Sequence, residues 1–184
     1  MADRVYTRRG DQGETSLLGQ GRVPKSDPRI RALGEIDEAS SAIGLARAAL
    51  CASAATDLKL DEALQAAQLC LSECAALIAA SGSDDADSAG IDPAKIASLE
   101  RFIDSLSGIT GGMPREFVLP GGCEKSARLH LARSVVRRAE RSVVELLEDT
   151  PVAAGVLAYM NRLSDALFAM AVHVSVTQGS APAD

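Results

Sequence analysis

Arg133, Arg137 and Glu140 follow one another at intervals of four and three residues, which places their side chains on one stripe of a helix. Two guanidinium groups beside a carboxylate can bind an anion such as a phosphate. The alternative is a solvated helix face held by intrahelical ion pairs. Glu140 is accordingly either an ion-pair partner of the arginines or a ligand of a magnesium ion that is bound to a polyphosphate.

Two further polar residues lie close to apolar helix faces in the sequence. Asp37 follows Ile36 and comes four residues after Leu33, so its carboxylate borders or occupies the inward face of its helix. A buried carboxylate needs a cationic or hydrogen-bonding partner, and the helix of Arg133 offers one. Asn161 lies beside the apolar seam of another helix, where a lone amide is more often structural.

The N-terminal segment, residues 1–27, has the composition of a phosphate-binding loop. Glycines let backbone N–H groups converge on an anion, hydroxyl groups donate hydrogen bonds, and cations neutralise the charge. The residues of these types are Thr7, Arg8, Arg9, Gly10, Asp11, Gly13, Thr15, Ser16 and Lys25. Gly-Asp-x-Gly is also common in plain turns, and the GxxxxGK[ST] and GxGxxG patterns are absent, so neither a P-loop nor a dinucleotide fold is predicted.

Other chemistries are not supported by the spacing of the residues. No Glu-x-x-His pair suggests a di-iron bundle and no Gly-x-Ser-x-Gly elbow suggests a hydrolase. The four cysteines form no CxxC pair and are expected to be buried thiols; they are Cys51, Cys70, Cys74 and Cys123. Phe117, in an apolar tripeptide that runs into Pro120-Gly121-Gly122, is on this pattern alone expected to be a core aromatic.

The elements that must position these residues are five helices. Apolar residues at intervals of three and four predict helices over about 28–51, 57–81, 93–107, 123–149 and 151–176. Residues 1–27 show no lasting period and are expected to be loop, as are the polar residues 81–92, and 177–184 are expected to be a tail. The prediction is an all-α, five-helix bundle forming a single domain over residues 1–184.

Composition limits the partners of this domain. The chain has 184 residues, 47% hydrophobic and 24% charged, which is enough apolar sequence for a sizeable core. A net charge of −6 argues against a nucleic-acid or anionic-membrane binder. The polar N-terminus and the absence of an apolar run of about 18 residues predict no membrane span. We expect a cytoplasmic protein, although a matrix protein after removal of a transit peptide has the same features.

Six ordered motifs together resemble the ATP:cob(I)alamin adenosyltransferases of the propanediol-utilisation type. They are Tyr6-Thr7-Arg8-Arg9-Gly10-Asp11-Gln12-Gly13, Arg22-Val23-Pro24-Lys25-Ser26-Asp27-Pro28-Arg29, Gly34-Glu35-Ile36-Asp37-Glu38, Phe117-Val118-Leu119-Pro120-Gly121-Gly122, the run 131–141 (LARSVVRRAER) and Asn161-Arg162-Leu163-Ser164-Asp165. The match spans nearly the whole chain. The resemblance implies a homotrimer with active sites between subunits. It also implies transfer of the 5′-deoxyadenosyl group from ATP to the cobalt of cob(I)alamin, with release of triphosphate.

The resemblance also implies roles for individual residues. The stretch from Thr7 to Gly13, with Thr15 and Lys25, is similar to the ATP loop of the family. Arg137, Glu140 and Asn161 resemble its nucleotide contacts, and Glu140 its contact to Mg²⁺. Arg133 resembles the catalytic arginine, paired with Asp37. Phe117 resembles the aromatic that packs beneath the corrin and keeps the lower axial ligand from cobalt.

The chain departs from the family pattern at Leu33, often a tyrosine, and at Ala39-Ser40, often Leu-Asn. These departures bear on the corrin side and leave the ATP motifs intact. The implied partners are a corrinoid reductase and an adenosylcobalamin-dependent enzyme. The alternative function is a non-catalytic carrier that binds ATP or adenosylcobalamin and delivers the cofactor to such an enzyme.

Overall fold

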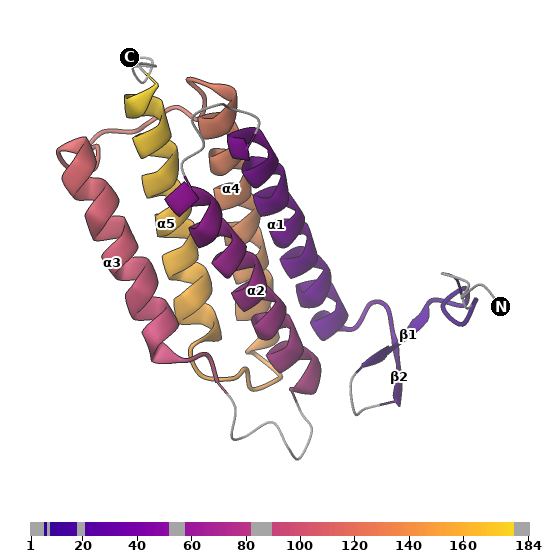
Figure 1. Cartoon of the computed structure of the whole chain (residues 1–184). Helices are drawn as coiled ribbons and strands as arrows, with labels where there is room; N and C mark the ends of the chain where they lie inside the picture. The colour runs from indigo at the N-terminus through magenta and orange to yellow at the C-terminus, as the bar shows by residue number, and fades with distance from the viewer. Residues whose placement is uncertain (1–5, 7, 18–20, 52–57, 82–89, 179–184) are drawn as a thin grey trace.

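The computed structural model describes residues 6, 8–17, 21–51, 58–81 and 90–178 (Figure 1). A two-stranded hairpin precedes five helices, so the predicted five-helix fold is confirmed. The strands are β1 (Glu14–Leu17) and β2 (Gly21–Pro24). The helices are α1 (Pro28–Cys51), α2 (Leu58–Ala80), α3 (Pro93–Thr110), α4 (Glu124–Leu146) and α5 (Val156–Thr177).

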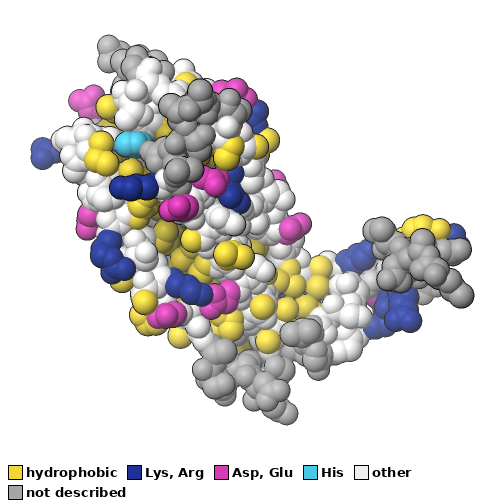
Figure 2. Space-filling model, viewed as in Figure 1, with side chains coloured by type: hydrophobic (Ala, Val, Ile, Leu, Met, Phe, Trp, Pro, Cys, Tyr) yellow, Lys and Arg dark blue, Asp and Glu magenta, His cyan; other side chains and the backbone are white. Residues whose placement is uncertain are grey.

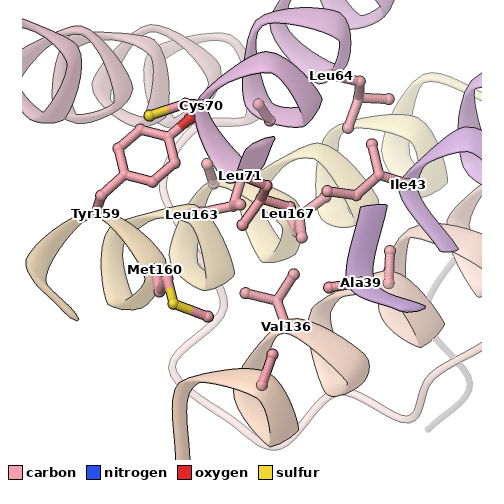
Figure 3. Close-up of a cluster of buried hydrophobic side chains, with 14 of the residues drawn as sticks. Ala39, Ile43, Leu64, Cys70, Leu71, Val136, Tyr159, Met160, Leu163 and Leu167 are labelled. Atoms are coloured by element: carbon pink, nitrogen blue, oxygen red, sulfur yellow. The ribbon is translucent and has the colours of Figure 1, made fainter. Parts of the chain in front are cut away.

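The helices pack so that α5 lies in the middle. It has α3 on one side and α4 on the other, while α1 packs against α4 and α2 (Figure 1). Figure 3 shows the core between these helices, where side chains from four of them point toward one another. The labelled aliphatic residues there are Ala39, Ile43, Leu64, Leu71, Val136, Leu163 and Leu167. This aliphatic core follows from the scarcity of aromatic residues in the chain.

The start of α1 is fixed by Asp27. Its Oδ1 accepts a hydrogen bond of 2.9 Å from the backbone N–H of Arg29, and Pro28 occupies the first helical position. The Arg29 guanidinium returns to the same carboxylate and also donates to the carbonyl of Ser81 at 3.3 Å. The cap therefore joins the beginning of α1 to the end of α2.

The start of α5 differs from the prediction. Thr150-Pro151 was expected to open the helix, yet α5 begins at Val156. Gly155 has φ 83°, which is outside the helical region, and the carbonyl of Ala154 accepts a hydrogen bond of 2.9 Å from the backbone N–H of Ile91. This bond ties the segment before α5 to the segment before α3, and a long-range contact of this kind has no local sequence signal.

Residues 14–17 and 21–24 also differ from the expected loop. Thr15 pairs with Val23 and Ser16 with Arg22 in an antiparallel ladder that stands off from the bundle (Figure 1). Strands of four residues are too short to establish a period of two in the sequence. The expected loop over 81–92 lies largely outside the described residues, as do residues 179–184 of the expected tail.

The cysteines are only partly as predicted. Cys70 and Cys74 are buried and Cys123 is half-buried, but Cys51 is exposed at the end of α1. By length and composition alone, Lys59–Ala80 could span a membrane. A core helix passes the same test, and Leu64, Leu71 and Ile78 of this helix are fully buried in the bundle.

Candidate active site

The seam between α4 and α5 carries most of the polar residues singled out in the sequence. The two helices run antiparallel, so contacts follow one another along the seam. Ser126 donates to the carbonyl of Ala171 at one end, and Asn161 donates to Glu140 toward the other. One continuous line along this seam therefore holds four of the predicted residues, namely Arg133, Arg137, Glu140 and Asn161.

Arg133 and Arg137 line a groove of about 380 Å³ in the middle of this seam, with Ile103 and Met113 on the opposite wall. Arg133 is half-buried, and its guanidinium carbon lies 5.9 Å from the centre of the Phe168 ring. Its Nε is buried and has no hydrogen-bond partner among the described residues. Arg137 is exposed. Two guanidinium groups in one open groove make a site for a multiply charged anion.

Glu140 lies at the end of this groove. Its Oε1 accepts a hydrogen bond of 3.1 Å from Nδ2 of Asn161, and within the described part of the chain it forms no ion pair with an arginine. Of the two alternatives for Glu140, the structure thus favours the oriented carboxylate over the ion-pair partner. A single oriented carboxylate suits Mg²⁺, which usually binds one or two carboxylates together with substrate phosphates and water.

The glycine-rich residues form a tight turn before the hairpin. Lys25 Nζ lies against Gly10, where a Cβ would be 3.3 Å away, and the backbone N–H of Lys25 donates to the carbonyl of Gly13 at 2.8 Å. Thr15 is half-buried in β1, whereas Arg8, Arg9 and Asp11 are exposed. Thr7 lies outside the described residues. Figure 2 shows Lys and Arg side chains gathered on this projecting unit.

Arg22 is a member of this unit that the site prediction missed. Its Nη2 donates to the carbonyl of Arg9 at 2.6 Å and its Nε to Glu14 at 3.0 Å. The turn that holds Gly10 is therefore fastened to β2 by a side chain. Arg22 stands in the second of the six motifs, which was the available signal.

The structure does not place Asp37 as expected. Asp37 is exposed and forms no ion pair with Arg133 within the described residues. Ile36 faces the core, and one helical step of about 100° carries the next side chain outward. The arginine of α4 that pairs with acidic residues of α1 is Arg138, whose guanidinium binds Glu35 at 2.6 Å and also Glu38. The expected buried pair within one chain is therefore wrong.

Phe117 is not a core aromatic either. Its side chain is 86% exposed, on the loop between α3 and α4. Behind it lies a hollow of about 260 Å³ lined by Val118, Leu119, His130 and Val172. This loop is extended and bounded by glycines with positive φ, so no helical period predicts where its side chains point. An exposed phenylalanine beside an apolar hollow is a contact surface for an apolar ligand.

His130, on α4, belongs to none of the predicted sites. The residue is 3% exposed. Its ring centre lies 6.0 Å from that of Phe168, and the angle between the two ring planes is 61°. Burial, and then the positive charge of Arg133, hold the pKa of His130 below its ordinary value, so the imidazole is neutral at neutral pH. Its position three residues before Arg133 is the signal that was missed.

A second hollow of about 380 Å³ lies away from these residues, between α2, α3 and α5. Its walls include Leu69, Leu99 and Phe102, and a band of hydrophobic side chains is visible there in Figure 2. Tyr159 and Cys70 also line it, and their side chains lie next to each other (Figure 3). The cation that lines this hollow, Lys95, is already paired with Glu73. Among the described residues, this hollow therefore has no counterpart of Arg133 and Arg137, and we place the polar site at the α4/α5 groove.

Comparison with known proteins agrees with this arrangement. The sequence profile of the cobalamin adenosyltransferase family matches residues 5–174. The corrinoid adenosyltransferase PduO of Citrobacter freundii is 39% identical over 168 residues, which are 91% of this chain and 48% of the relative. The chain thus spans about half the length of this relative and of its Salmonella typhimurium counterpart. The corrinoid adenosyltransferase of Mycobacterium tuberculosis H37Rv is also 39% identical, over 90% of this chain and 85% of its own.

Solved structures match over almost the whole chain. A variant of the PduO-type ATP:corrinoid adenosyltransferase of Lactobacillus reuteri, with a phenylalanine replaced by alanine and complexed with cobalamin and ATP, is 31% identical. It superposes with a TM-score of 0.88 over 97% of each chain. An arginine-to-lysine variant of the L. reuteri enzyme, complexed with ATP, is 32% identical and gives a TM-score of 0.85 over 96% of each chain.

Proposed function

This chain belongs to the cobalamin adenosyltransferase family, and we propose that it transfers the 5′-deoxyadenosyl group of ATP to the cobalt of cob(I)alamin, giving adenosylcobalamin and triphosphate. The observation that carries the proposal is the α4/α5 seam. Arg133 and Arg137 line its polar groove, Glu140 follows Arg137 by three residues on α4, and the loop of Phe117 borders the apolar hollow at the other end of the seam. A polyphosphate and a large apolar ring system can therefore lie side by side.

The polar groove is the phosphate end of the site. In the proposed transfer the cobalt(I) electron pair attacks C5′ of ATP, the Co–C bond forms, and the C5′–O bond breaks. Triphosphate leaves with the bonding electrons. Arg133 and Arg137 stabilise the negative charge that develops on the leaving oxygen. No proton has to move in this step, and the carboxylate that also lines the groove, Asp165, is paired with Arg162 at 3.1 Å.

Glu140 and Asn161 are the residues that fit Mg²⁺ at this end. The carboxylate supplies the hard oxygen ligand and the amide of Asn161 fixes its orientation at 3.1 Å. When bound, Mg²⁺ neutralises phosphate charge. The residues of the chain hold the triphosphate so that its leaving oxygen points toward the corrinoid.

Phe117 marks the corrinoid end. Of the three phenylalanines, Phe102 and Phe168 are half-buried in the bundle and Phe117 alone is exposed. An aromatic ring beneath the corrin displaces water and the lower axial ligand, which makes reduction to cobalt(I) easier. The solved relatives in complex with cobalamin include a phenylalanine variant, in agreement with such a role.

The N-terminal unit completes the site from a neighbouring subunit of a homotrimer. Among the described residues, the hydrogen bonds of residues 8–25 stay within that segment apart from one at its end, where the carbonyl of Pro24 accepts from the backbone N–H of Asp27, and the hairpin stands off from the bundle (Figure 1). Its ATP-loop residues, Thr7 included, reach the groove of the adjoining copy. Asp37 is exposed on α1, so its partner Arg133 is likewise supplied by the adjoining copy.

The remaining features of the proposal concern the whole protein. It acts as a single domain over 1–184 in the cytoplasm, receives its corrinoid from a reductase and passes its product to an adenosylcobalamin-dependent enzyme. At the positions where the chain departs from the family, Leu33 and Ser40 are half-buried and Ala39 is fully buried. The carbonyl of Ser40 accepts a hydrogen bond of 2.9 Å from Gln68, so this position also anchors α2.

The decisive experiment is an anaerobic assay with MgATP and chemically reduced cob(I)alamin. We expect the adenosylcobalamin spectrum to appear together with one triphosphate per cofactor formed. Binding of both ligands without product indicates the non-catalytic carrier and contradicts the proposal. Size-exclusion chromatography with light scattering tests the trimer, and mixing Lys25→Ala subunits with Arg137→Ala subunits tests the shared site. Regained activity in the mixture is expected, because some interfaces then have both residues intact.

A further inference from the structure

Three side chains at the middle of the α4/α5 seam form a continuous stack. The Phe168 ring of α5 contacts two residues of α4. The ring centre of His130 is 6.0 Å away at an interplanar angle of 61°, and the guanidinium carbon of Arg133 lies over the Phe168 ring, 5.9 Å from its centre. Edge-to-face aromatic pairs and guanidinium–ring contacts both favour one orientation over others. The position of Arg133 therefore depends on Phe168, and that of Phe168 on His130.

This stack lies between the two ends of the proposed site. His130 lines the apolar hollow behind Phe117, whereas Phe168 and Arg133 line the polar groove. The reacting C5′–Co pair has to form where these two regions meet. A side chain buried at that junction can set the position of Arg133.

The surroundings of His130 suit a neutral ring and not a charged one. It is 3% exposed, and its Nδ1 has no hydrogen-bond partner among the described residues. Arg133 is the charged group that faces it from α4. Toward it from α5 and the preceding loop lie apolar or uncharged residues, among them Phe168, Val172 and Leu119. No carboxylate lines this hollow to stabilise an imidazolium, so protonation sets two positive charges against each other across a dry contact.

We infer that His130 is a positioning residue: its neutral ring supports Phe168, Phe168 supports the guanidinium of Arg133, and protonation of His130 displaces that guanidinium from the groove. The inference rests on the proposed function, because it assigns the groove to the phosphates of ATP. It predicts an acid limb in the pH profile of adenosylation, in which the rate falls as His130 becomes protonated.

The first test needs no substrate and so separates this inference from the proposed function. The chain has two histidines, so an NMR titration gives two imidazole midpoints, assigned with a His173→Phe variant. We expect the midpoint of His130 to lie below the ordinary value of about 6.5 and to rise in Arg133→Gln, because a neighbouring positive charge has been removed. A midpoint at or above that value, or one that Arg133→Gln leaves unchanged, overturns the inference.

The second test measures kcat and KM against pH. His130→Phe keeps a ring against Phe168 and cannot be protonated, so the acid limb of kcat disappears. His130→Leu is apolar but has no ring, and we expect kcat to fall about 10- to 100-fold with little change in either KM, since Arg133 is misplaced and not removed. His173→Phe, at the other buried histidine, leaves the limb in place. Wild-type kcat in His130→Leu, or an acid limb that persists in His130→Phe, overturns the inference.

Discussion

Asn161 on α5 donates a hydrogen bond of 3.1 Å from Nδ2 to Oε1 of Glu140 on α4. The contact crosses the helix seam at the end of the arginine groove, where it fixes the carboxylate plane. Because an amide and not a cation makes this contact, the charge of Glu140 is not neutralised by its partner. A carboxylate that is oriented but not ion-paired can be used to bind a cation.

The first prediction concerns that charge. Glu140→Gln keeps an oxygen that can accept from Asn161 but removes the negative charge, so we expect the Mg²⁺ concentration for half-maximal rate to rise about tenfold or more. The measurement is the initial rate against Mg²⁺ at saturating ATP. Glu145→Gln is the matched control, since Glu145 is on the same helix but is exposed and paired with Arg31 at 3.3 Å. An equal shift in both variants contradicts the assignment.

The second prediction concerns Arg137. It is exposed and lines the groove, so Arg137→Ala removes a charge-assisted phosphate contact but no packing. We expect KM for ATP to rise about 10- to 100-fold while the free energy of unfolding changes by less than about 0.5 kcal/mol. Arg137→Lys keeps the charge without the planar fork and should give an intermediate KM. Arg141→Ala, one turn further along α4, is the control; unchanged ATP kinetics in Arg137→Ala disprove the role.

The apolar pattern of the sequence predicted the ends of α1 and α2 to within one residue, because helix periodicity is a local property. The start of α5 could not be predicted, since it depends on a hydrogen bond between Ala154 and Ile91. The stripe of Arg133 was found for the same local reason as the helices. Asp37 was misplaced because one step of about 100° separates an inward from an outward position, and periodicity does not resolve that angle at the border of a face.

The third prediction concerns Phe117, whose exposure could not be deduced from an aperiodic loop. Because its side chain is 86% exposed, Phe117→Ala should leave the melting temperature unchanged. We expect adenosylation to slow sharply with ATP affinity preserved, since water or the lower ligand then reaches cobalt. Ile109→Ala removes another exposed apolar side chain and serves as the control. Identical axial coordination in the spectra of cob(II)alamin bound to wild type and to Phe117→Ala contradicts the role.

The fourth prediction is a pH dependence of stability. Hydrogen bonding to Arg29 holds the pKa of Asp27 below its ordinary value of 3.8. The ionised form is therefore the one favoured in the folded protein, so its contribution is complete above about pH 4 and is lost as the pH falls through the lower, folded value. Asp27→Asn should unfold more easily at pH 7 and lose its difference from wild type at acid pH. A difference that does not shrink as the pH falls below about 4 contradicts this explanation.

The last prediction concerns Asp37 and Arg133. Asp37 is exposed and unpaired with Arg133 within the described residues, so Asp37→Asn should not carry the penalty of about 3–5 kcal/mol expected for breaking a buried pair inside one chain. If the partner is the Arg133 of an adjoining copy, the loss appears in assembly. We expect trimer dissociation at higher protein concentration and reduced activity, with the unfolding of the subunit unchanged. Asp104→Asn, an exposed acidic residue on α3, is the control.

A double-mutant cycle on the dissociation constant of the trimer isolates this pair, because it subtracts what each residue contributes elsewhere. Reversing both charges, with Asp37→Arg and Arg133→Asp together, should restore part of the assembly but little catalysis, since the groove then lacks the guanidinium that lies against Phe168. Recovery of assembly and activity together shows that the pair only holds the subunits in place. A coupling energy of zero removes the pair from the site, and Arg133 then acts in the groove without Asp37.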